Sequence, residues 1–393
     1  MESHRGVPGP KHLGLDRRKL LWGLGGAGLS AAGLGRFAAA VETPGRFAAE
    51  PERSLASDAA PPYPLSRVVL PAQDHAEWSA FKQRFLTPDG RVIDTHNGGV
   101  SHSEGQGWGL LLAVAFDDPA AFNLILGWTR RALRRPRDHL YAWRYRPGVP
   151  NPVSDSNNAT DGDLYIAAAM ARAARRWDRP ELEAAAAEVA RDVLRLLVRR
   201  VGGRTVLLPG AEGFEKADHV VLNPSYYAFP VLGDLAAVAP SPVWARLRDD
   251  GLALITEGRF GRWGLPPDWL RLDRRDGQLA PAAAWPARFS YDAIRVPLNL
   301  AWAGVTPPEL QAAFVRYWAD ARGGIPAWVD LHTGDVAAYP APPGIRAVTR
   351  FAAERQGLDL PIAHVFVKDA TDYYSAVLIV LSRVAQAESG PSV

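Results

Sequence analysis

The chain of 393 residues contains no cysteine. This absence excludes disulfide bonds, thiolate metal sites and a cysteine nucleophile together. Two further catalytic motifs are missing: the GxSxG elbow of serine hydrolases and the Gly-Lys-Ser/Thr phosphate loop. A formal GxGxxG occurs at residues 23–28, but no strand precedes it and no nucleotide-binding domain surrounds it. A zinc site could draw on Asp94, His96 and His102, yet their spacing matches no standard ligand motif.

A surplus of positive charge is also absent from most of the chain. The net charge is +3, but residues 1–40 alone carry six basic and two acidic side chains. The remaining residues therefore sum to about −1, and we expect no nucleic-acid partner.

The first 64 residues have the pattern of an export leader and a linker. An arginine pair, Arg17-Arg18, precedes a short glycine-rich apolar run, and the small residues 38–40 offer a cleavage site. This order is typical of a twin-arginine export signal over residues 1–40. The apolar run is short for a permanent membrane span, although an uncleaved anchor is the alternative. Residues 41–64 are rich in Pro and Ala without a sustained period, which predicts a flexible linker.

From residue 65 onwards, apolar residues recur mostly at helical spacing. The expected helices cover residues 74–86, 106–116, 118–134, 160–177, 180–200, 225–238, 241–256, 289–303, 307–320, 346–356 and 371–387. Strand signals are confined to 204–208 and 334–339. The pattern predicts one all-α domain over residues 65–387, a closed toroid of helix hairpins whose long loops form a groove at one end.

Glu104 stands in the stretch VSHSEGQGWG, residues 100–109, beside three glycines. On its own, this stretch is more typical of a turn before the apolar run at 110–116. Glycine nevertheless lets another surface come close, because it lacks a Cβ. We therefore expect the glycines to leave room for a ligand to approach the Glu104 carboxylate.

Two other acidic segments stand in unusual surroundings. Asp161 and Asp163 flank a glycine at the start of an apolar helix, where Thr160 or Asp161 could cap the free N–H groups of the first turn. Asp292 and Arg295 are three residues apart in an otherwise apolar segment, so on a helix they share a face and form an ion pair. A charge in such a segment needs a partner or a function.

Carboxylates combined with many aromatic residues favour glycoside hydrolysis. That chemistry uses one protonated acid, one ionised base and flat rings that stack on sugars. The chain has 13 Trp and 11 Tyr, most of which core packing would absorb. Trp108, Trp143 and Trp302 are candidate stacking platforms, with Trp143 preferred because it lies in a loop-rich region.

Three segments in order, residues 97–118, 153–167 and 289–302, resemble motifs of glycoside hydrolase family 8. Within that family, they are most similar to the periplasmic endoglucanases encoded with bacterial cellulose synthase. The resemblance implies an (α/α)6 barrel that cleaves β-1,4-glucan, or cellulose, with inversion and without a cofactor.

The resemblance also assigns roles residue by residue. Glu104 falls on the general acid, Asp292 on the general base and Asp161 on the aspartate that contacts the sugar at the cleavage point. Arg295 matches the arginine beside the base. Tyr226 or Tyr227 should hold the base and its water, while Tyr373 and Tyr374 match a tyrosine pair in the wall of the groove. Trp108 stands where a tyrosine is commoner, and Ser375 where an acidic residue is frequent, which leaves the subsite preference open.

Several alternatives stay open at this point. Other members of the family act on xylan, mixed-linkage glucan or chitosan, and a glycan-binding component of a secretion complex would be a different class of protein. The leader predicts a periplasmic or secreted protein without a lasting membrane span, and the resemblance adds the cellulose synthase complex as a partner.

Overall fold

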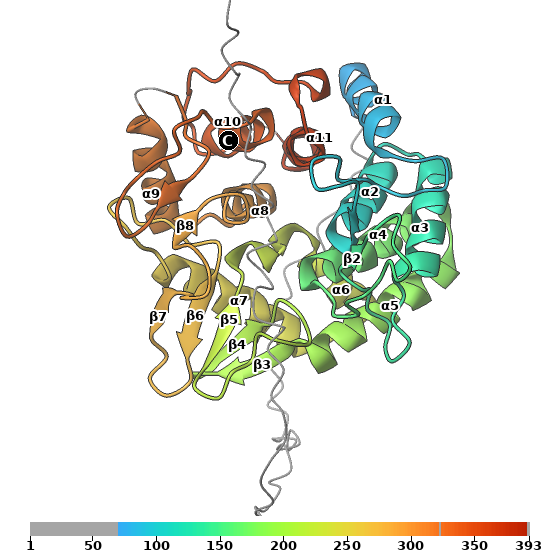
Figure 1. Ribbon diagram of the computed structural model, residues 1–393, viewed down its shortest axis with the longest axis horizontal. Helices are drawn as coiled ribbons and strands as arrows, with labels where there is room; N and C mark the ends of the chain where they lie inside the picture. The colour runs from blue at the N-terminus through green and yellow to red at the C-terminus, as the bar shows by residue number, and fades with distance from the viewer. Residues whose placement is uncertain (1–69, 322–323, 391–393) are drawn as a thin grey trace, which may run out of the picture.

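The computed structural model describes residues 70–321 and 324–390, so the expected export signal and linker lie outside the described residues. Eleven α-helices dominate this part of the chain (Figure 1). They are α1 (Ala72–Phe85), α2 (Ser103–Ala115), α3 (Pro119–Leu133), α4 (Thr160–Trp177), α5 (Pro180–Leu196), α6 (Phe229–Val238), α7 (Pro242–Glu257), α8 (Arg295–Ala303), α9 (Pro308–Ala319), α10 (Pro343–Glu354) and α11 (Tyr373–Glu388).

Six of these helices contact one another in a closed ring. The order of contact is α2, α4, α6, α8, α10, α11 and back to α2. Helices α1, α3, α5 and α7 pack outside this ring against α11, α2, α4 and α6, respectively. The arrangement is the closed toroid that the helix pattern predicts and the (α/α)6 barrel that the resemblance implies (Figure 1).

The inner helices are apolar on nearly every side because each is surrounded by other helices. In α4, every residue from 160 to 174 is buried, and six of these are alanines that let neighbouring helices approach. The outer helix α5 instead buries a single stripe that includes Leu182, Ala186, Val189 and Val193. This spacing of three to four residues is the signal from which the helix was predicted.

The glycines beside Glu104 have a different role from the expected one. They belong to helix α2, which begins at Ser103 rather than at residue 106. A Cβ on Gly107 would lie 2.8 Å from the Cβ of Tyr165 in α4, and one on Gly105 would lie 2.7 Å from Tyr373 Oη. The glycines therefore let α2 pack closely against α4 and α11, and the prediction that they make room for a ligand is wrong.

The strands are short and more numerous than predicted. Strands β3 (Val198–Val201) and β4 (Arg204–Leu207) form a hairpin, so the helix expected over 180–200 ends at residue 196. Strands β5 (His219–Leu222), β6 (Leu270–Asp273) and β7 (Leu279–Pro281) form an antiparallel sheet in that order. The strand expected over 334–339 is wrong, since only an isolated bridge joins Val336 to Val329 there.

The other strands form two pairs of two residues each. Strand β1 (Ser101–His102) pairs with β2 (Arg144–Tyr145), and β8 (Arg288–Phe289) pairs with β9 (Val329–Asp330). These pairs join loops that precede α2 and α8 to distant parts of the chain. Two 3-10 turns, Pro224–Tyr226 and Val367–Asp369, precede α6 and α11.

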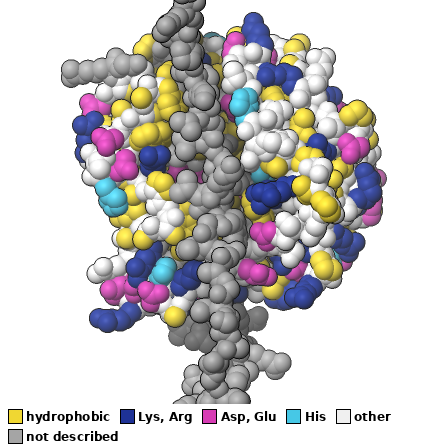
Figure 2. Space-filling model, viewed as in Figure 1, with side chains coloured by type: hydrophobic (Ala, Val, Ile, Leu, Met, Phe, Trp, Pro, Cys, Tyr) yellow, Lys and Arg dark blue, Asp and Glu magenta, His cyan; other side chains and the backbone are white. Residues whose placement is uncertain are grey.

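The surface carries mixed charge. On the face shown in Figure 2, basic and acidic side chains intermingle around the periphery. Within the described ranges, no helix combines the length and the apolar character needed to cross a bilayer.

Candidate active site

The predicted site residues meet where the inner helices begin. Glu104 is the second residue of α2, Asp161 is the second residue of α4, and Arg295 is the first residue of α8. Helix N-termini carry partial positive charge, which favours carboxylates in the first turn. Three segments far apart in the sequence thus bring ionisable side chains to one end of the barrel.

Arg295 connects three carboxylates. Its Nη1 donates to Glu104 Oε2 at 2.6 Å and to Asp161 Oδ2 at 2.8 Å, while Nη2 donates to Asp292 Oδ1 at 2.6 Å. The predicted Asp292–Arg295 ion pair is confirmed. Asp292 itself lies in a turn, because residues 288 and 289 form β8 and the helix expected over 289–303 begins only at Arg295.

The side chains of the cluster differ in how far they are exposed to solvent. The side chains of Asp161, Arg295 and Glu104 are 0%, 2% and 6% exposed, whereas that of Asp292 is 29% exposed. Burial opposes the charge of Arg295, but Glu104, Tyr374, Asp292 and Asp161 together raise its pKa well above the usual value. The guanidinium is therefore a permanent cation at the centre of the cluster, and Asp292 is the carboxylate that water reaches most easily.

Two aromatic rings flank the guanidinium. The Cζ atom of Arg295 lies 5.5 Å from the ring centroid of Trp108 and 5.5 Å from that of Tyr226. Such contacts hold a buried arginine by cation–π attraction. Trp108 is fully buried against Tyr165 and Tyr374, so its predicted role as a sugar platform is wrong, and it supports Arg295 instead.

The structure separates the tyrosines at 226 and 227. Tyr226 lies beside Arg295, as described above. Tyr227 points to the outer layer, where its ring packs on Gly251 of α7 and its hydroxyl accepts a hydrogen bond from Leu207 N at 3.2 Å. Burial raises the pKa of Tyr227. Of the two, Tyr226 is the one at the site, and the assignment of Tyr227 to it is wrong.

Tyr373 and Tyr374 open helix α11 next to the carboxylates. Tyr374 donates its hydroxyl hydrogen bond to the carbonyl of Tyr291, the residue before Asp292. Tyr373 packs between Phe81, Phe85 and Gly105. Both rings are largely buried, so they form the floor of the site and not an open wall.

The other predicted platforms are also covered. Trp143 is buried, donates from Nε1 to Asp155 Oδ2 at 2.7 Å, stacks near His102 and has the guanidinium of Arg144 4.2 Å from its ring. Trp302 is buried at the opposite end of α8 and donates to Glu388 Oε2 at 3.0 Å. Trp302 is therefore a core residue. The role of Trp143 as a sugar platform stays a prediction, since the ring is buried and the Arg144 guanidinium lies over it.

The capping interpretation of the 160–163 segment is only half right. Asp161 Oδ1 accepts from Gly162 N at 2.8 Å, but the Thr160 hydroxyl donates to Leu208 O and does not cap the helix. Asp163 accepts from Tyr141 N and from Asn158, each at 2.8 Å. Burial raises the pKa of Asp163 to about 8. Asp163 fixes the loop before α4 and does not join the Arg295 cluster.

Sequence reasoning missed several residues near the site. Tyr291 and the exposed Tyr339 approach within 3.4 Å through their hydroxyls, next to Asp292. Trp269 stacks on the partly exposed Trp285 at 4.8 Å and meets Tyr226 edge-on at 6.2 Å. An aromatic residue directly before a candidate base was the one available signal for Tyr291, whereas the Trp pair is assembled by β6 and its neighbouring loops.

Asp268 was also missed. It lies between α7 and β6 and accepts hydrogen bonds from the backbone on both sides of Asp292, from Ser290 N at 3.0 Å and Ala293 N at 2.8 Å. Burial and, next, the charge of Asp292 raise the pKa of Asp268 to about 7. No local pattern in the sequence identifies this pairing.

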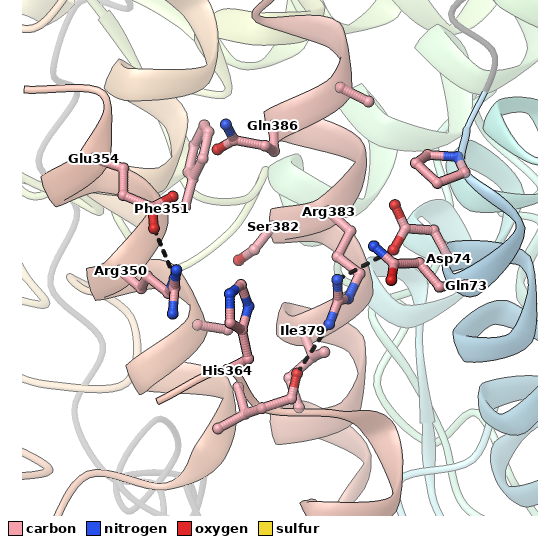
Figure 3. A pocket seen from close by; sticks show the side chains of 14 residues that line it. Gln73, Asp74, Arg350, Phe351, Glu354, His364, Ile379, Ser382, Arg383 and Gln386 are labelled. Atoms are coloured by element: carbon pink, nitrogen blue, oxygen red, sulfur yellow. Dashed lines mark hydrogen bonds and ion pairs between the residues drawn. The ribbon is translucent and has the colours of Figure 1, made fainter. Parts of the chain in front are cut away.

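A separate cavity of about 350 Å³ lies between α1, α10 and α11 (Figure 3). Its charged side chains pair with one another: Arg350 binds Glu354 at 2.7 Å, and Arg383 binds Asp74 at 3.1 Å. The Arg383–Asp74 pair joins α11 to α1, whereas Arg350 and Glu354 both lie on α10. The Arg295 cluster is not part of the cavity lining.

The residues considered for a zinc site do not form a set of metal ligands. His102 Nδ1 lies 4.0 Å from Asp94 Oδ2. Across residues 70–321 and 324–390, no three His, Cys, Asp or Glu side chains gather in a way that could hold a metal ion.

Comparison with known proteins finds relatives over most of the chain. The family model described as glycosyl hydrolases family 8 matches residues 65–388. A probable endoglucanase of Novacetimonas hansenii is 46% identical over 313 residues, which are 79% of this chain and 90% of the relative. An endoglucanase of Cellulomonas uda is 42% identical over 273 residues, 69% of this chain and 75% of the relative.

A solved structure agrees as well. The endo-β-1,4-glucanase of Acetobacter xylinum superposes with a TM-score of 0.77 at 45% identity, over 80% of this chain and 98% of that one. The range that the family model matches, residues 65–388, includes the three segments that meet at Arg295. The chain belongs to glycosyl hydrolase family 8.

Proposed function

We propose that the protein is an endo-acting glucanase that hydrolyses β-1,4-glucosidic bonds of cellulose with inversion of the anomeric centre. One observation carries the proposal: a single buried guanidinium binds the carboxylates of Glu104, Asp161 and Asp292 at the end of the barrel. Glycoside hydrolysis needs two carboxyl groups in different protonation states across the scissile bond. The Arg295 cluster contains carboxyl groups for both roles, and one guanidinium holds them together.

Glu104 is the proposed proton donor to the leaving glycosidic oxygen. Arg295 carries one positive charge, whereas the three carboxylates around it would carry three negative charges if all were ionised. Three neighbouring carboxylates that are mostly buried are costly to ionise together, so the cluster is expected to retain a proton. Glu104 is in the right place to hold it, since its side chain is buried and it stands at the end of the barrel.

Asp292 is the proposed base. Its carboxylate is the most exposed of the three, so a water molecule can reach it, and it accepts a hydrogen bond from Arg295 Nη2 that holds it in place. In an inverting enzyme, this water attacks the anomeric carbon from the face opposite the acid. Asp161, which is held by Arg295 and Gly162 N, is the proposed contact to the sugar at the cleavage point. These steps use only side chains and water.

Cellulose is the proposed substrate because of the relatives. The proteins of Novacetimonas hansenii and Cellulomonas uda are named endoglucanases, and the Acetobacter xylinum structure is an endo-β-1,4-glucanase. Leader-like residues 1–40 support export to the periplasm or the exterior, followed by a linker over 41–64. Together they support a role in trimming cellulose during its synthesis and export, with the synthase complex as a partner.

The substrate assay compares reducing-sugar release from carboxymethyl-cellulose, mixed-linkage glucan, xylan and chitosan. We expect the highest kcat/KM on carboxymethyl-cellulose together with a rapid fall in viscosity, since an endo-acting enzyme cuts within the chain. Higher kcat/KM on xylan or chitosan would overturn the substrate assignment. Binding to cellulose without release of sugar from any polymer would favour a glycan-binding component.

The stereochemical assay follows the first product by proton NMR. Inversion predicts that the α-anomer appears first and then mutarotates to the equilibrium mixture. Early appearance of the β-anomer would contradict the proposed roles of Glu104 and Asp292.

A further inference from the structure

Asp268 is attached to the backbone on both sides of the proposed base. Its Oδ1 accepts the N–H groups of Ser290 and Ala293, and its Oδ2 is bonded by the Ser290 hydroxyl. Its own N–H donates to Arg288 O at 2.7 Å. These bonds span the residues immediately before and after Tyr291 and Asp292.

The turn held in this way leads directly into α8. Ile294 N donates to Ser290 O at 2.9 Å, and Arg295 N donates to Asp292 O at 3.0 Å. The position of the Asp292 carboxylate relative to Arg295 thus depends on a turn whose N–H groups are anchored by one side chain. Loss of that anchor would leave buried donors without partners and would let the turn relax.

Asp268 also acts on Asp292 by charge. The two carboxylates repel each other when both are ionised, and Arg295 is the cation nearest to Asp292. Arg288, in the adjoining strand β8, places its guanidinium over Trp328, at 3.8 Å, and also interacts with Asp330. Glu104 and Asp161 complete the charged groups linked through Arg295.

We propose that Asp268 is a positioning residue for the reaction, which fixes the turn that carries Asp292 and adds a titratable negative charge behind it. The proposal rests on the role of Asp292 as the base. The Ser290 hydroxyl can donate or accept, so the contact persists whether Asp268 is ionised or protonated. The side chain touches no reacting atom and acts only through Asp292.

Two substitutions at residue 268 separate the two effects. Asp268→Ala removes the anchor and the charge, and we expect kcat on carboxymethyl-cellulose to fall about 10-fold or more while KM changes less than about threefold. Asp268→Asn keeps an oxygen that can accept from Ser290 N and Ala293 N, and we expect it to restore most of kcat at about pH 5.

The pH profile of kcat/KM tests whether the negative charge of Asp268 affects the neighbouring carboxyl groups. Burial and Asp292 place the pKa of Asp268 at about 7, so the residue is already neutral on the acid limb, and Asp268→Asn should leave that limb in place. Above that pKa, wild-type Asp268 gains a negative charge that helps neighbouring carboxyls to keep their protons. Removing this charge should move the alkaline limb to lower pH by about half a unit or more.

Asp192→Ala is the matched control. Asp192 also accepts a backbone N–H, that of His139 at 2.8 Å, but it lies on the outer helix α5 away from the Arg295 cluster. We expect Asp192→Ala to lower the melting temperature and leave kcat and the pH profile unchanged.

Asp292→Asn, assayed in parallel, keeps the two claims distinguishable. If Asp292→Asn loses activity while Asp268→Ala keeps the wild-type kcat, the inference about Asp268 is wrong and the role of Asp292 stands. If Asp292→Asn stays active, the proposed base is wrong. A fall of kcat in Asp268→Asn equal to that in Asp268→Ala, with an unshifted profile, would overturn the role of the charge.

Discussion

Arg295 organises the site at the scale of single residues. It holds three carboxylates from α2, α4 and the turn before α8 through two of its nitrogens, and rings of Trp108 and Tyr226 flank it. A planar guanidinium can reach several acceptors in fixed directions, whereas an ammonium is a compact point charge. The geometry of the carboxylates therefore depends on arginine and not only on positive charge.

We expect Arg295→Lys to lower kcat on carboxymethyl-cellulose about 100-fold or more, because lysine cannot hold Glu104 and Asp292 in one arrangement. Initial rates at saturating substrate measure the effect, and circular dichroism checks the fold. Arg350→Lys is the control, since Arg350 forms a partly exposed pair with Glu354 on α10. Retention of more than about a tenth of wild-type kcat by Arg295→Lys would contradict this view of the site.

The residues of the Arg295 cluster could be predicted from short segments of the sequence, whereas Asp268, which anchors the turn around Asp292, could not. Glu104, Asp161, Asp292 and Arg295 each stand in a segment whose local pattern is unusual. Asp268 meets its partners 22 and 25 residues further along the chain, through hydrogen bonds that only the folded loops create.

At the scale of elements, the contact between α2 and α4 sets the distance between Glu104 and Asp161. A Cβ on Gly162 would lie 2.3 Å from Ser103 Oγ and 2.7 Å from Glu104 N. Real Cβ atoms do not tolerate such contacts, so the helices approach at this point only because residue 162 is a glycine.

Gly162→Ala is expected to reduce the free energy of unfolding by about 2 kcal/mol and to lower kcat, because it forces α4 away from the backbone of Glu104. Gly127→Ala in the outer helix α3 is the matched control, since the added Cβ meets only the Arg131 side chain at 3.2 Å. Alanine favours a helix over glycine by up to about 1 kcal/mol, so this control should be neutral or stabilising. Urea unfolding compares the two, and equal stability of both variants would contradict the account.

Helices were easier to predict than strands for a physical reason. Helix α5 repeats its apolar stripe over about three turns, whereas β8 and β9 have two residues each, too few to show a period. The sheet of β5 and β6 joins residues about 50 positions apart, so its register arises from the tertiary fold.

At the scale of the whole molecule, a polar network joins four inner helices at the end opposite to the site. Arg172 of α4 binds Asp234 of α6 at 2.7 Å and Glu388 of α11 at 3.2 Å. Glu388 in turn accepts from Trp302 of α8 at 3.0 Å. Arg172 lies three turns along α4 from Asp161, about 16 Å at 1.5 Å per residue.

Arg172→Met should therefore lower stability without changing the chemistry. Loss of one partner from a buried ion pair costs about 3–5 kcal/mol, and we expect the melting temperature to fall by at least about 5 °C. Well below that temperature, kcat should stay within about twofold of wild type. Arg191→Met, at an exposed position on α5, is the control for the loss of one arginine. A large fall of kcat in the folded Arg172→Met variant would show that the two ends of the barrel are coupled.

The toroid was predicted from alternating helices, and the eleven helices expected from the sequence correspond in order to the eleven that the described residues form. Between α10 and α11, the described chain forms a 3-10 turn at Val367–Asp369 and no α-helix. The ring still closes, because α10 and α11 contact each other directly and Gly344 of α10 packs on the backbone of Ser375.

The central claim is that Glu104 gives its proton to the leaving oxygen. It is tested most directly by the rate of reducing-sugar release from carboxymethyl-cellulose by Glu104→Gln. The control is Glu309→Gln, because Glu309 is likewise the second residue of a helix, the outer helix α9, and is exposed. The account predicts a loss of about 100-fold or more in kcat for Glu104→Gln with the wild-type fold retained, and wild-type kcat for Glu309→Gln. A folded Glu104→Gln enzyme that keeps wild-type kcat would contradict it.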